Sequence, residues 1–273
     1  MTGDLSSYTK ENFQAVRTAL IKQLVGGKET CAQSEPHAVL LGGQSGAGKT
    51  MLHDIYDSAY QGNIIVVNGD DYRSYHPHYD EIAYAYGKDA ALYTVEWSGK
   101  MTEALVNALS IMQYNLLVED TLRTVEVPVK TAKLLKSRGY HVTLSLMAVK
   151  PEISYISCQL RYEKMRVAGM VPRATSLEHH NEIVREIVGN VKALEELDLF
   201  EGISLYSRTG KCLFESDVED MSKGEIPVAG KHKQHTASVV LHEIMFGEWT
   251  LEEKRHYEFL QNMVEALKGG KNE

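Results

Sequence analysis

Residues 43–50 have the residue types and spacing of a phosphate-binding loop. Their sequence, GQSGAGKT, matches G-x-x-x-x-G-K-[ST] at every fixed position. Glycines let successive backbone N–H groups turn inward around a phosphate, the Lys49 ammonium adds positive charge, and the Thr50 hydroxyl can ligate Mg²⁺. An incidental glycine-rich turn is disfavoured, because an apolar segment precedes the loop and a helical pattern follows it. The predicted nucleoside triphosphate contacts are Gly43, Gln44, Ser45, Gly46, Ala47, Gly48, Lys49 and Thr50.

Acidic side chains follow the next two apolar segments of the chain. NIIVVN leads to Asp70 and Asp71, and YNLLV leads to Glu119 and Asp120. We expect these side chains near the loop, because ligands bind at the carboxyl ends of parallel strands. A kinase places a carboxylate beside an acceptor hydroxyl, whereas an ATPase positions a water molecule. The residues alone leave both chemistries open, since LLVED also resembles a Walker B segment and Asp70-Asp71 suits a solvated turn.

Basic side chains flank a break in the chain farther along. Arg161 precedes Pro172 on a helical pattern, and Arg173 follows it in a short link. Kinases of this architecture bring arginines over the transferring phosphate, where they neutralise charge while water is excluded. A basic helical stretch is also typical of a solvated helix face. The sequence indicates a lid near residues 161–175, with the role of the arginines open on this pattern alone.

The histidine and cysteine patterns do not favour a metal centre. His76 and His78 lack a third or fourth ligand at metal-binding spacing, so we expect a structural role for the pair. Cys31, Cys158 and Cys212 lie far apart and form no C-x-x-C motif. Neither a disulfide framework nor a zinc site is predicted.

The composition is that of an ordinary globular protein. The chain has 273 residues, 43% of them hydrophobic and 24% charged, with a net charge of −8. That negative balance argues against a nucleic acid as the main ligand. The first residues lack a signal-peptide pattern, and no apolar run approaches the roughly 20 residues of a membrane-spanning helix. We expect a cytoplasmic protein with no membrane partner.

Apolar segments alternate with helical patterns over most of the chain. The predicted strands are 37–41, 63–68, 114–120 and 141–149, and the predicted helices are 8–25, 50–60, 125–138, 151–166 and 175–197. This alternation favours βαβ crossovers and a mostly parallel sheet covered on both faces by helices. The expected fold is therefore a three-layer α/β fold of the P-loop NTPase type with helical additions.

The last part of the chain has a different residue pattern. Residues 202–216 read as a hairpin turning at Thr209-Gly210, and Thr175 with Glu178 reads as a capping box for the preceding helix. Residues 217–235 are polar and irregular, and two helical patterns follow them. We predict one P-loop kinase domain over 1–273, with a kinase core at 37–216 and a C-terminal helical extension at 217–273.

An ordered set of motifs runs along the chain: GGQSGAGKT, NGDDYRSYHPHYDE, YGKDAALYT, GKMTEALVNALS, YNLLVEDTLRTVEVPVKTAKLLKSRGY, LRYEKM and PRATSLEHH. Together these motifs resemble the zeta toxin family, especially its PezT-like branch. They span about residues 37–216, and LHEIMFGEW near the end also fits. The resemblance implies a phosphotransferase-like P-loop fold. It also implies a toxin kinase that uses ATP and Mg²⁺ to phosphorylate the 3′-hydroxyl of the amino sugar in UDP-N-acetylglucosamine, which inhibits cell-wall synthesis. A small helical antitoxin would obstruct the nucleotide site.

The resemblance assigns roles to individual residues. Asp70 matches the proton-accepting aspartate, and Lys49 and Thr50 match the phosphate and magnesium contacts. Arg161 and Arg173 match the two arginines around the transferring phosphate. The residues that match sugar-nucleotide contacts are Glu103, Glu119, Thr121 and Thr131.

One residue departs from the family pattern. Asp120 stands where the family usually carries a glycine. A carboxylate there either adds negative charge beside the expected diphosphate or points away, since successive strand residues alternate faces. The departure leaves open which sugar nucleotide binds and how strongly. Two alternatives stand beside the family reading: a P-loop kinase of another acceptor, such as a nucleotide or an antibiotic, or a nucleotide switch that is not a kinase, with LLVED as its Walker B segment.

Overall fold

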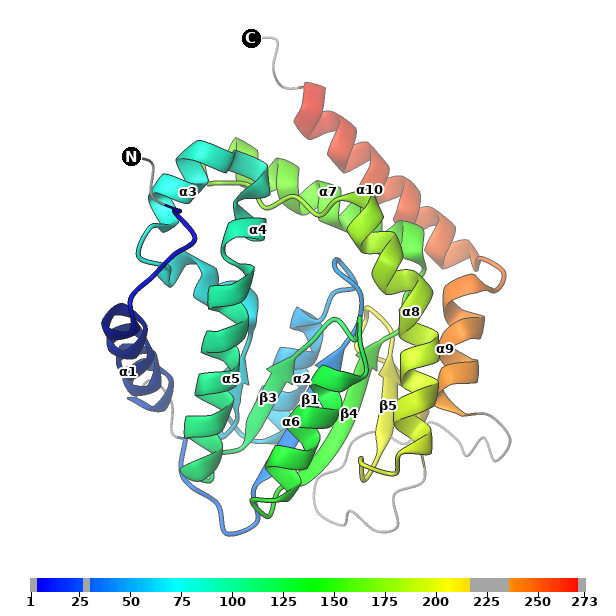
Figure 1. Ribbon diagram of the computed structural model, residues 1–273. Coiled ribbons are helices and arrows are strands. Elements are labelled where there is room, and N and C mark those ends of the chain that lie inside the picture. Colours follow the sequence, from blue (N-terminus) through cyan, green and yellow to red (C-terminus); the bar gives the residue numbers. More distant parts are fainter. Residues whose placement is uncertain (1–3, 27–29, 217–235, 270–273) are drawn as a thin grey trace.

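A single mixed sheet forms the centre of the molecule (Figure 1). The computed structural model describes residues 4–26, 30–216 and 236–269. The strand order is β2-β3-β1-β4-β5-β6, with all neighbours parallel except the antiparallel pair β5 and β6. The strands are β1 (His37–Gly42), β2 (Ile65–Val67), β3 (Leu116–Glu119), β4 (His141–Met147), β5 (Ile203–Tyr206) and β6 (Cys212–Glu215). The prediction of a mostly parallel sheet is confirmed.

The side chains of β1 show why both sheet faces are covered. Ala38 and Leu40 enter one hydrophobic core, while Val39 and Leu41 enter the other. This division follows from the two-residue repeat of a strand, whose successive side chains point to opposite faces. All four are apolar, so β1 is stable only with helices on both sides.

Helices form the two outer layers (Figure 1). One face is covered by α1 (Lys10–Gly26), α5 (Val95–Ile111), α6 (Glu126–Lys136), α8 (Leu177–Glu196) and α9 (Ala237–Phe246). The other face is covered by α2 (Thr50–Ala59), α7 (Pro151–Val167) and α10 (Leu251–Gly269). Between β2 and α5 the chain forms η1 (Gly69–Tyr75), α3 (Tyr79–Tyr86), η2 (Gly87–Asp89) and α4 (Ala90–Tyr93). The expected three layers are confirmed.

Two local predictions need correction. The predicted strand at 63–68 is shorter, because Asn63 and Asn115 hydrogen-bond before pairing begins at Ile65. The capping box of Thr175 and Glu178 is wrong. Ser176 is the N-cap of α8, and its side chain accepts a hydrogen bond from the backbone N–H of His179.

The C-terminal part follows the predicted order where it is described. β5 and β6 form the expected hairpin, and Gly210 adopts φ 81° in its turn, a region that favours glycine. α9 and α10 occupy the two predicted helical segments, whereas 217–235 lies outside the described residues. The single-domain division over 1–273 stays a prediction. Among the described helices, none has the length and apolar character needed to cross a membrane.

The buried His180 gives the fold a predicted pH dependence. Its Nε2 lies 2.8 Å from Ser154 Oγ, joining α8 to α7, and burial is the main cause that lowers its pKa. Because the folded pKa lies below the unfolded one, the unfolded chain takes up the proton first as pH falls below about 6.5. Neutral His180 therefore stabilises the fold above that pH, and this stabilisation is lost as the pH falls below it.

We expect this loss to be smaller in His180→Asn, which cannot be protonated. Urea unfolding of both proteins at about pH 7.5 and pH 5.5 measures the difference. The variant is less stable at the higher pH, so the comparison uses the change with pH and not the absolute free energy. If the free energy of unfolding changes equally with pH in the two proteins, the prediction is wrong.

Candidate active site

The predicted phosphate-binding loop leaves the carboxyl end of β1 in a conformation that needs glycine. Gly43, Gly46 and Gly48 have φ values of 137°, 78° and 97°. A Cβ atom on Gly46 would lie 2.0 Å from the carbonyl oxygen of Ser154 in the first turn of α7. No side chain fits there, so the loop packs directly against α7. The glycines therefore supply both the left-handed turns and the close approach of two backbones.

Neighbouring side chains fix the loop further. Lys49 Nζ donates to the carbonyl oxygen of Gly43 at 2.9 Å. The fully buried Gln44 donates from Nε2 to the carbonyl oxygen of Val149 at 3.0 Å. Thr50 is the first residue of α2, whose amino end favours an anion. This strand–loop–helix arrangement can bind a chain of phosphates.

Asp70 lies directly after β2, at the start of η1. Its backbone N–H donates to the N-cap residue Asn68 at 3.1 Å. Its Oδ1 accepts a hydrogen bond from Arg73 Nε at 2.8 Å, and its Oδ2 lies 3.6 Å from Arg173 Nη1. Arg173 also donates to the carbonyl oxygen of Asp70 at 3.4 Å. The structure thus brings together Asp70 and Arg173, which are about a hundred residues apart in sequence.

Opposing effects act on the acidity of Asp70. Burial raises the pKa of its carboxyl, but the hydrogen bond and charge of Arg73, with the charges of Arg173 and Arg161, outweigh burial. The net result is a pKa below the ordinary value of an aspartic acid. Asp70 is therefore ionised at neutral pH and can accept a hydrogen bond from an approaching hydroxyl.

Arg161 on α7 is a third arginine whose charge acts on Asp70. Its Nη2 donates to Thr175 Oγ1 at 3.4 Å, and its buried Nε has no hydrogen-bond partner among the described residues. Its charge acts on the carboxyl of Asp70 and also on the thiol of Cys158, which would lie 2.8 Å from a Cβ on Gly46. Arg161 therefore acts electrostatically on Asp70 from the same helix, α7, against which the loop packs.

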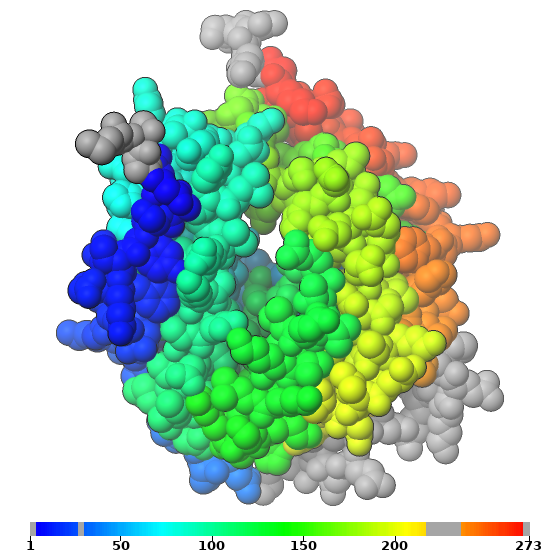
Figure 2. Space-filling model, in the orientation of Figure 1, coloured from blue at the N-terminus to red at the C-terminus, as the bar shows by residue number. Residues whose placement is uncertain are grey.

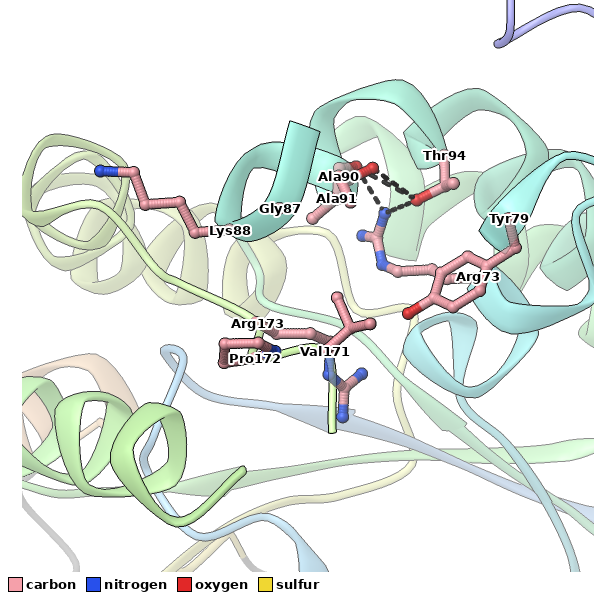
Figure 3. A pocket seen from close by; sticks show the side chains of 10 residues that line it. All are labelled: Arg73, Tyr79, Gly87, Lys88, Ala90, Ala91, Thr94, Val171, Pro172 and Arg173. Atoms are coloured by element: carbon pink, nitrogen blue, oxygen red, sulfur yellow. Dashed lines mark hydrogen bonds between the residues drawn. The ribbon is translucent and has the colours of Figure 1, made fainter. Parts of the chain in front are cut away.

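The site opens into a hollow of the molecule. Figure 2 shows this hollow between α3, α4 and α5 on one side and α8 on the other. A pocket is lined by η1, α4 and the link that carries Val171, Pro172 and Arg173 (Figure 3). There Arg73 Nη1 donates to the carbonyl oxygen of Ala91 at 2.8 Å and to Thr94 Oγ1 at 3.3 Å. From the sequence, Arg73 is only an added cation beside Asp70 and Asp71, because its partners Asp70, Ala91 and Thr94 meet in the fold.

The carboxyl end of β3 supplies a second acidic group. Glu119 Oε1 lies 2.8 Å from Nε2 of His53, one turn into α2, and both side chains are largely buried. Asp71 is close enough for the charges of Arg173, Glu119 and His53 to affect its pKa, which is raised mainly by burial. Sequence reasoning missed His53. Its position three residues after Thr50, on the same face of α2, was the available signal.

Asp120 turns toward its own loop. Its Oδ1 accepts hydrogen bonds from the backbone N–H groups of Thr121 and Leu122, the latter at 3.0 Å. Leu122 is fully buried with φ 54°, a conformation that costs a leucine free energy and that these hydrogen bonds help to hold. Burial raises the pKa of Asp120, although Lys49 is near enough to oppose that effect. In this structure one oxygen of the extra carboxylate thus braces the loop that presents Thr121.

Two of the residues expected to contact the sugar nucleotide lie apart from Asp70 and its partners. Glu103 on α5 forms an ion pair with Lys130 on α6 at 2.9 Å, and both side chains are exposed. Thr131 is the next residue of α6 and is half-buried. Within the described part of the chain, neither Glu103 nor Thr131 makes a hydrogen bond or ion pair with Asp70.

The two histidines after η1 have packing partners. His76 is buried with its ring edge-on to Trp97 at a centroid distance of 5.2 Å, and its Nε2 lies 3.3 Å from the carbonyl oxygen of Ser6. The backbone N–H of His78 donates to His76 Nδ1 at 3.1 Å. Across residues 4–26, 30–216 and 236–269, no three acidic, histidine or cysteine side chains gather to hold a metal ion.

Comparisons with known proteins agree with this geometry. A family model described as "Zeta toxin" matches residues 21–219. The chain is 45% identical to Toxin PezT of Streptococcus pneumoniae serotype 4, over 92% of this chain and 93% of that protein. It is 33% identical to Toxin zeta of Streptococcus pyogenes, over 97% and 94% respectively. A solved structure from the pneumococcal PezAT toxin–antitoxin system superposes with a TM-score of 0.84 at 42% identity, covering 96% of this chain and 99% of that one. The chain belongs to the zeta toxin family.

Proposed function

We propose that this chain is an ATP-dependent kinase that phosphorylates an alcohol group of a UDP-sugar. The observation that carries the proposal is an ionised carboxylate, Asp70, which two arginines hold and on which the charge of a third, Arg161, also acts, in the same fold as a phosphate-binding loop. A nucleotide switch or ATPase needs a positioned water molecule, whereas this arrangement suits a hydroxyl acceptor. Family membership makes UDP-N-acetylglucosamine the preferred acceptor, phosphorylated at its 3′-hydroxyl.

In the proposed reaction the loop with Lys49, the carboxylate of Asp70 and the two arginines have separate roles. The loop amides and Lys49 bind the β- and γ-phosphates of ATP at the amino end of α2. Asp70 takes the proton of the acceptor hydroxyl as the new bond from that oxygen to the γ-phosphorus forms. The bond from the γ-phosphorus to the bridging oxygen breaks, and ADP leaves. Arg161 and Arg173 neutralise the charge on the γ-phosphoryl oxygens.

Thr50 is the residue that would hold a magnesium ion. Its hydroxyl stands at the first position of α2, next to the loop, which fits the usual habit of Mg²⁺ to take few protein ligands. Phosphate oxygens and water supply the remaining ligands in such sites. When bound, the ion neutralises charge on the β- and γ-phosphates.

The sugar nucleotide is assigned to the side of the hollow where β3 ends. Glu119 and Thr121 are available there, and Glu103 with Thr131 would complete the contacts from α5 and α6. The similar pneumococcal structure belongs to a toxin–antitoxin system. We therefore also propose that a small helical antitoxin binds this chain and obstructs its nucleotide site, and that the free kinase inhibits cell-wall synthesis.

A transfer assay tests the acceptor. The purified chain is incubated with ATP labelled in the γ-phosphate, Mg²⁺ and one sugar nucleotide at a time: UDP-N-acetylglucosamine, UDP-N-acetylgalactosamine or UDP-glucose. We expect label on UDP-N-acetylglucosamine. Label on none of them, with phosphate released at the same rate whether or not a sugar is present, would overturn the proposal.

Arg73 is expected to position Asp70 and to hold its pKa low. In Arg73→Met the hydrogen bond and charge are lost, burial dominates, and the pKa of Asp70 rises. Because the base must be ionised, the acidic limb of the pH profile of kcat/KM moves to higher pH. Arg73→Lys keeps the charge, but the lysine cannot reach Asp70, Ala91 and Thr94 together. We therefore expect a smaller shift of the acidic limb.

Lys88→Met is the matched control. Lys88 lines the same pocket, but its exposed side chain points away from Arg73 (Figure 3). We expect its pH profile to coincide with that of the unmodified protein. If Arg73→Met slows the reaction without moving the acidic limb, Arg73 serves only to hold η1 against α4.

A further inference from the structure

Arg208 lies at the edge of the sheet where the phosphate-binding loop is found. It follows the carboxyl end of β5 in the turn to β6, which is closed by hydrogen bonds between Ser207 and Lys211 and from Gly210 to Ser207. Ligands of open α/β sheets bind outside the carboxyl ends of the strands. The tight turn therefore holds a guanidinium group at the ligand-binding edge, from a part of the sequence that showed no motif.

Contacts place that guanidinium against the outer side of the loop. Arg208 Nη1 donates to Ser157 Oγ on α7 at 2.7 Å and to the carbonyl oxygen of Gly46 at 3.4 Å. A Cβ atom on Gly48 would lie 3.6 Å from Arg208 Nε. The cation thus spans the loop from Gly46 to Gly48, beside the amino end of α2.

Arg208 has no acidic partner in the part of the chain that the structure describes. The side chain is half-buried, and burial lowers the pKa of its guanidinium, opposed only by the Cys158 thiol. Removing a cation from water without a counter-ion costs free energy. An anion that binds beside Gly48 would remove this cost.

A residue of α10 also responds to the charge of Arg208. Burial and that charge both lower the pKa of His256, whose buried Nε2 has no hydrogen-bond partner among the described residues. The contacts of Arg208 itself place the cation beside Gly46 and Gly48, which indicates that an anion belongs next to this part of the loop.

We propose that Arg208 is a nucleotide-binding residue that contacts the α-phosphate of the bound ATP or ADP. The inference rests on the ATP site of the proposed function. Lys49 and the inner side of the loop take the β- and γ-phosphates. The guanidinium beside Gly48 then remains for the phosphate that joins the nucleoside.

Titration calorimetry with ATP and with ADP, each with Mg²⁺, tests this contact. Arg208→Met removes the charge and the hydrogen-bond donors while keeping much of the side-chain volume. We expect the Kd of both nucleotides to rise by at least about 10-fold, since hydrogen bonds to charged groups are the strong ones. Arg208→Lys restores part of the affinity. An unchanged Kd for both nucleotides overturns the proposal. A loss of affinity for ATP alone also overturns it, because that result would place Arg208 at the γ-phosphate.

Two further variants separate binding from support of the fold. Lys211→Met removes an exposed cation from the same hairpin, and we expect Kd to stay within about 2-fold. Ser157→Ala removes the hydrogen bond that ties Arg208 to α7 but leaves the cation, so the Kd of ADP should rise by less than about 3-fold. If Ser157→Ala weakens ADP as much as Arg208→Met does, Arg208 acts only as a brace and the proposal fails.

The same titrations distinguish this inference from the proposed function. An unmodified chain that binds neither nucleotide contradicts the ATP site itself. An unmodified chain that binds both, with Arg208→Met binding them equally well, contradicts only the role of Arg208. Thermal unfolding of each variant checks that a change in Kd does not come from a partly unfolded protein.

Discussion

Replacing Asp70 with asparagine is expected to reduce kcat for phosphoryl transfer by about 1,000-fold, the scale of a lost general base. Asparagine has nearly the same shape and can still accept a hydrogen bond from Arg73 Nε, but it cannot take the proton of the acceptor. In the described part of the chain no hydrogen bond or ion pair joins this side chain to the phosphate-binding loop, so the Kd of ATP should stay within about 2-fold. Single-turnover transfer and calorimetry measure the two quantities separately.

Asp71→Asn is the control for this experiment. It removes the same charge one residue later, from a carboxylate that Arg73 does not hold, so any general effect of charge near Arg173 appears in both variants. We expect its kcat to fall by less than about 10-fold. If Asp71→Asn loses as much activity as Asp70→Asn, or if Asp70→Asn stays near normal, the base has been assigned to the wrong residue.

Arg161→Met is expected to lower kcat by about 1,000-fold, within the range found when an arginine over a transferring phosphate is removed. Its buried Nε has no hydrogen-bond partner within the residues that the structure describes, and its charge acts on the Asp70 carboxyl and on the Cys158 thiol. The charge on the γ-phosphoryl oxygens is redistributed in the transition state, where a fixed cation is most effective. The KM for ATP should therefore change much less than kcat.

Lys164→Met tests whether any lost cation on this helix has the same effect. Lys164 lies three residues later on α7 and is exposed. Steady-state rates of both variants at saturating ATP give the comparison. An Arg161→Met protein with a raised KM and an unchanged kcat would place Arg161 in ground-state binding and not over the transferring phosphate.

The sequence predicted the structure of the phosphate-binding loop more accurately than that of the segments around it. Residues 43–50 form a fixed pattern whose strand and helix are local, so β1 and α2 follow from the neighbouring apolar residues. The capping box failed because Thr175 accepts a hydrogen bond from Arg161, which leaves Ser176 to cap α8. That competition depends on tertiary contacts that no local pattern contains.

The helices between β2 and α5 were not predicted for a related reason. Over Gly69–Tyr93 the helical segments are short, and their hydrophobic side chains, many of them tyrosines, follow no clear repeat. They form because Trp97 and its neighbours provide a surface for them, as in the hydrogen bond from Trp97 Nε1 to the carbonyl oxygen of Tyr72 at 2.9 Å. Arg73 acquires its partners only through this packing.

Asp120 shows the limit of reasoning from family patterns alone. A carboxylate in place of the family glycine raised the question of charge repulsion with a diphosphate. The fold gives one of its oxygens to the backbone N–H groups of Thr121 and Leu122, which a glycine cannot do. These hydrogen bonds form in the folded loop, beside the left-handed backbone at Leu122, and no sequence pattern specifies them.

Phosphorus NMR of the reaction product tests most directly where the phosphate goes. The chain is incubated with ATP, Mg²⁺ and UDP-N-acetylglucosamine, and the purified product is examined for coupling between the new phosphorus and the sugar protons. We expect a phosphomonoester coupled to the proton on carbon 3 of the amino sugar, with ADP formed in equal amount. Inorganic phosphate as the only new phosphorus species, or a phosphate on another molecule, would contradict the proposed reaction.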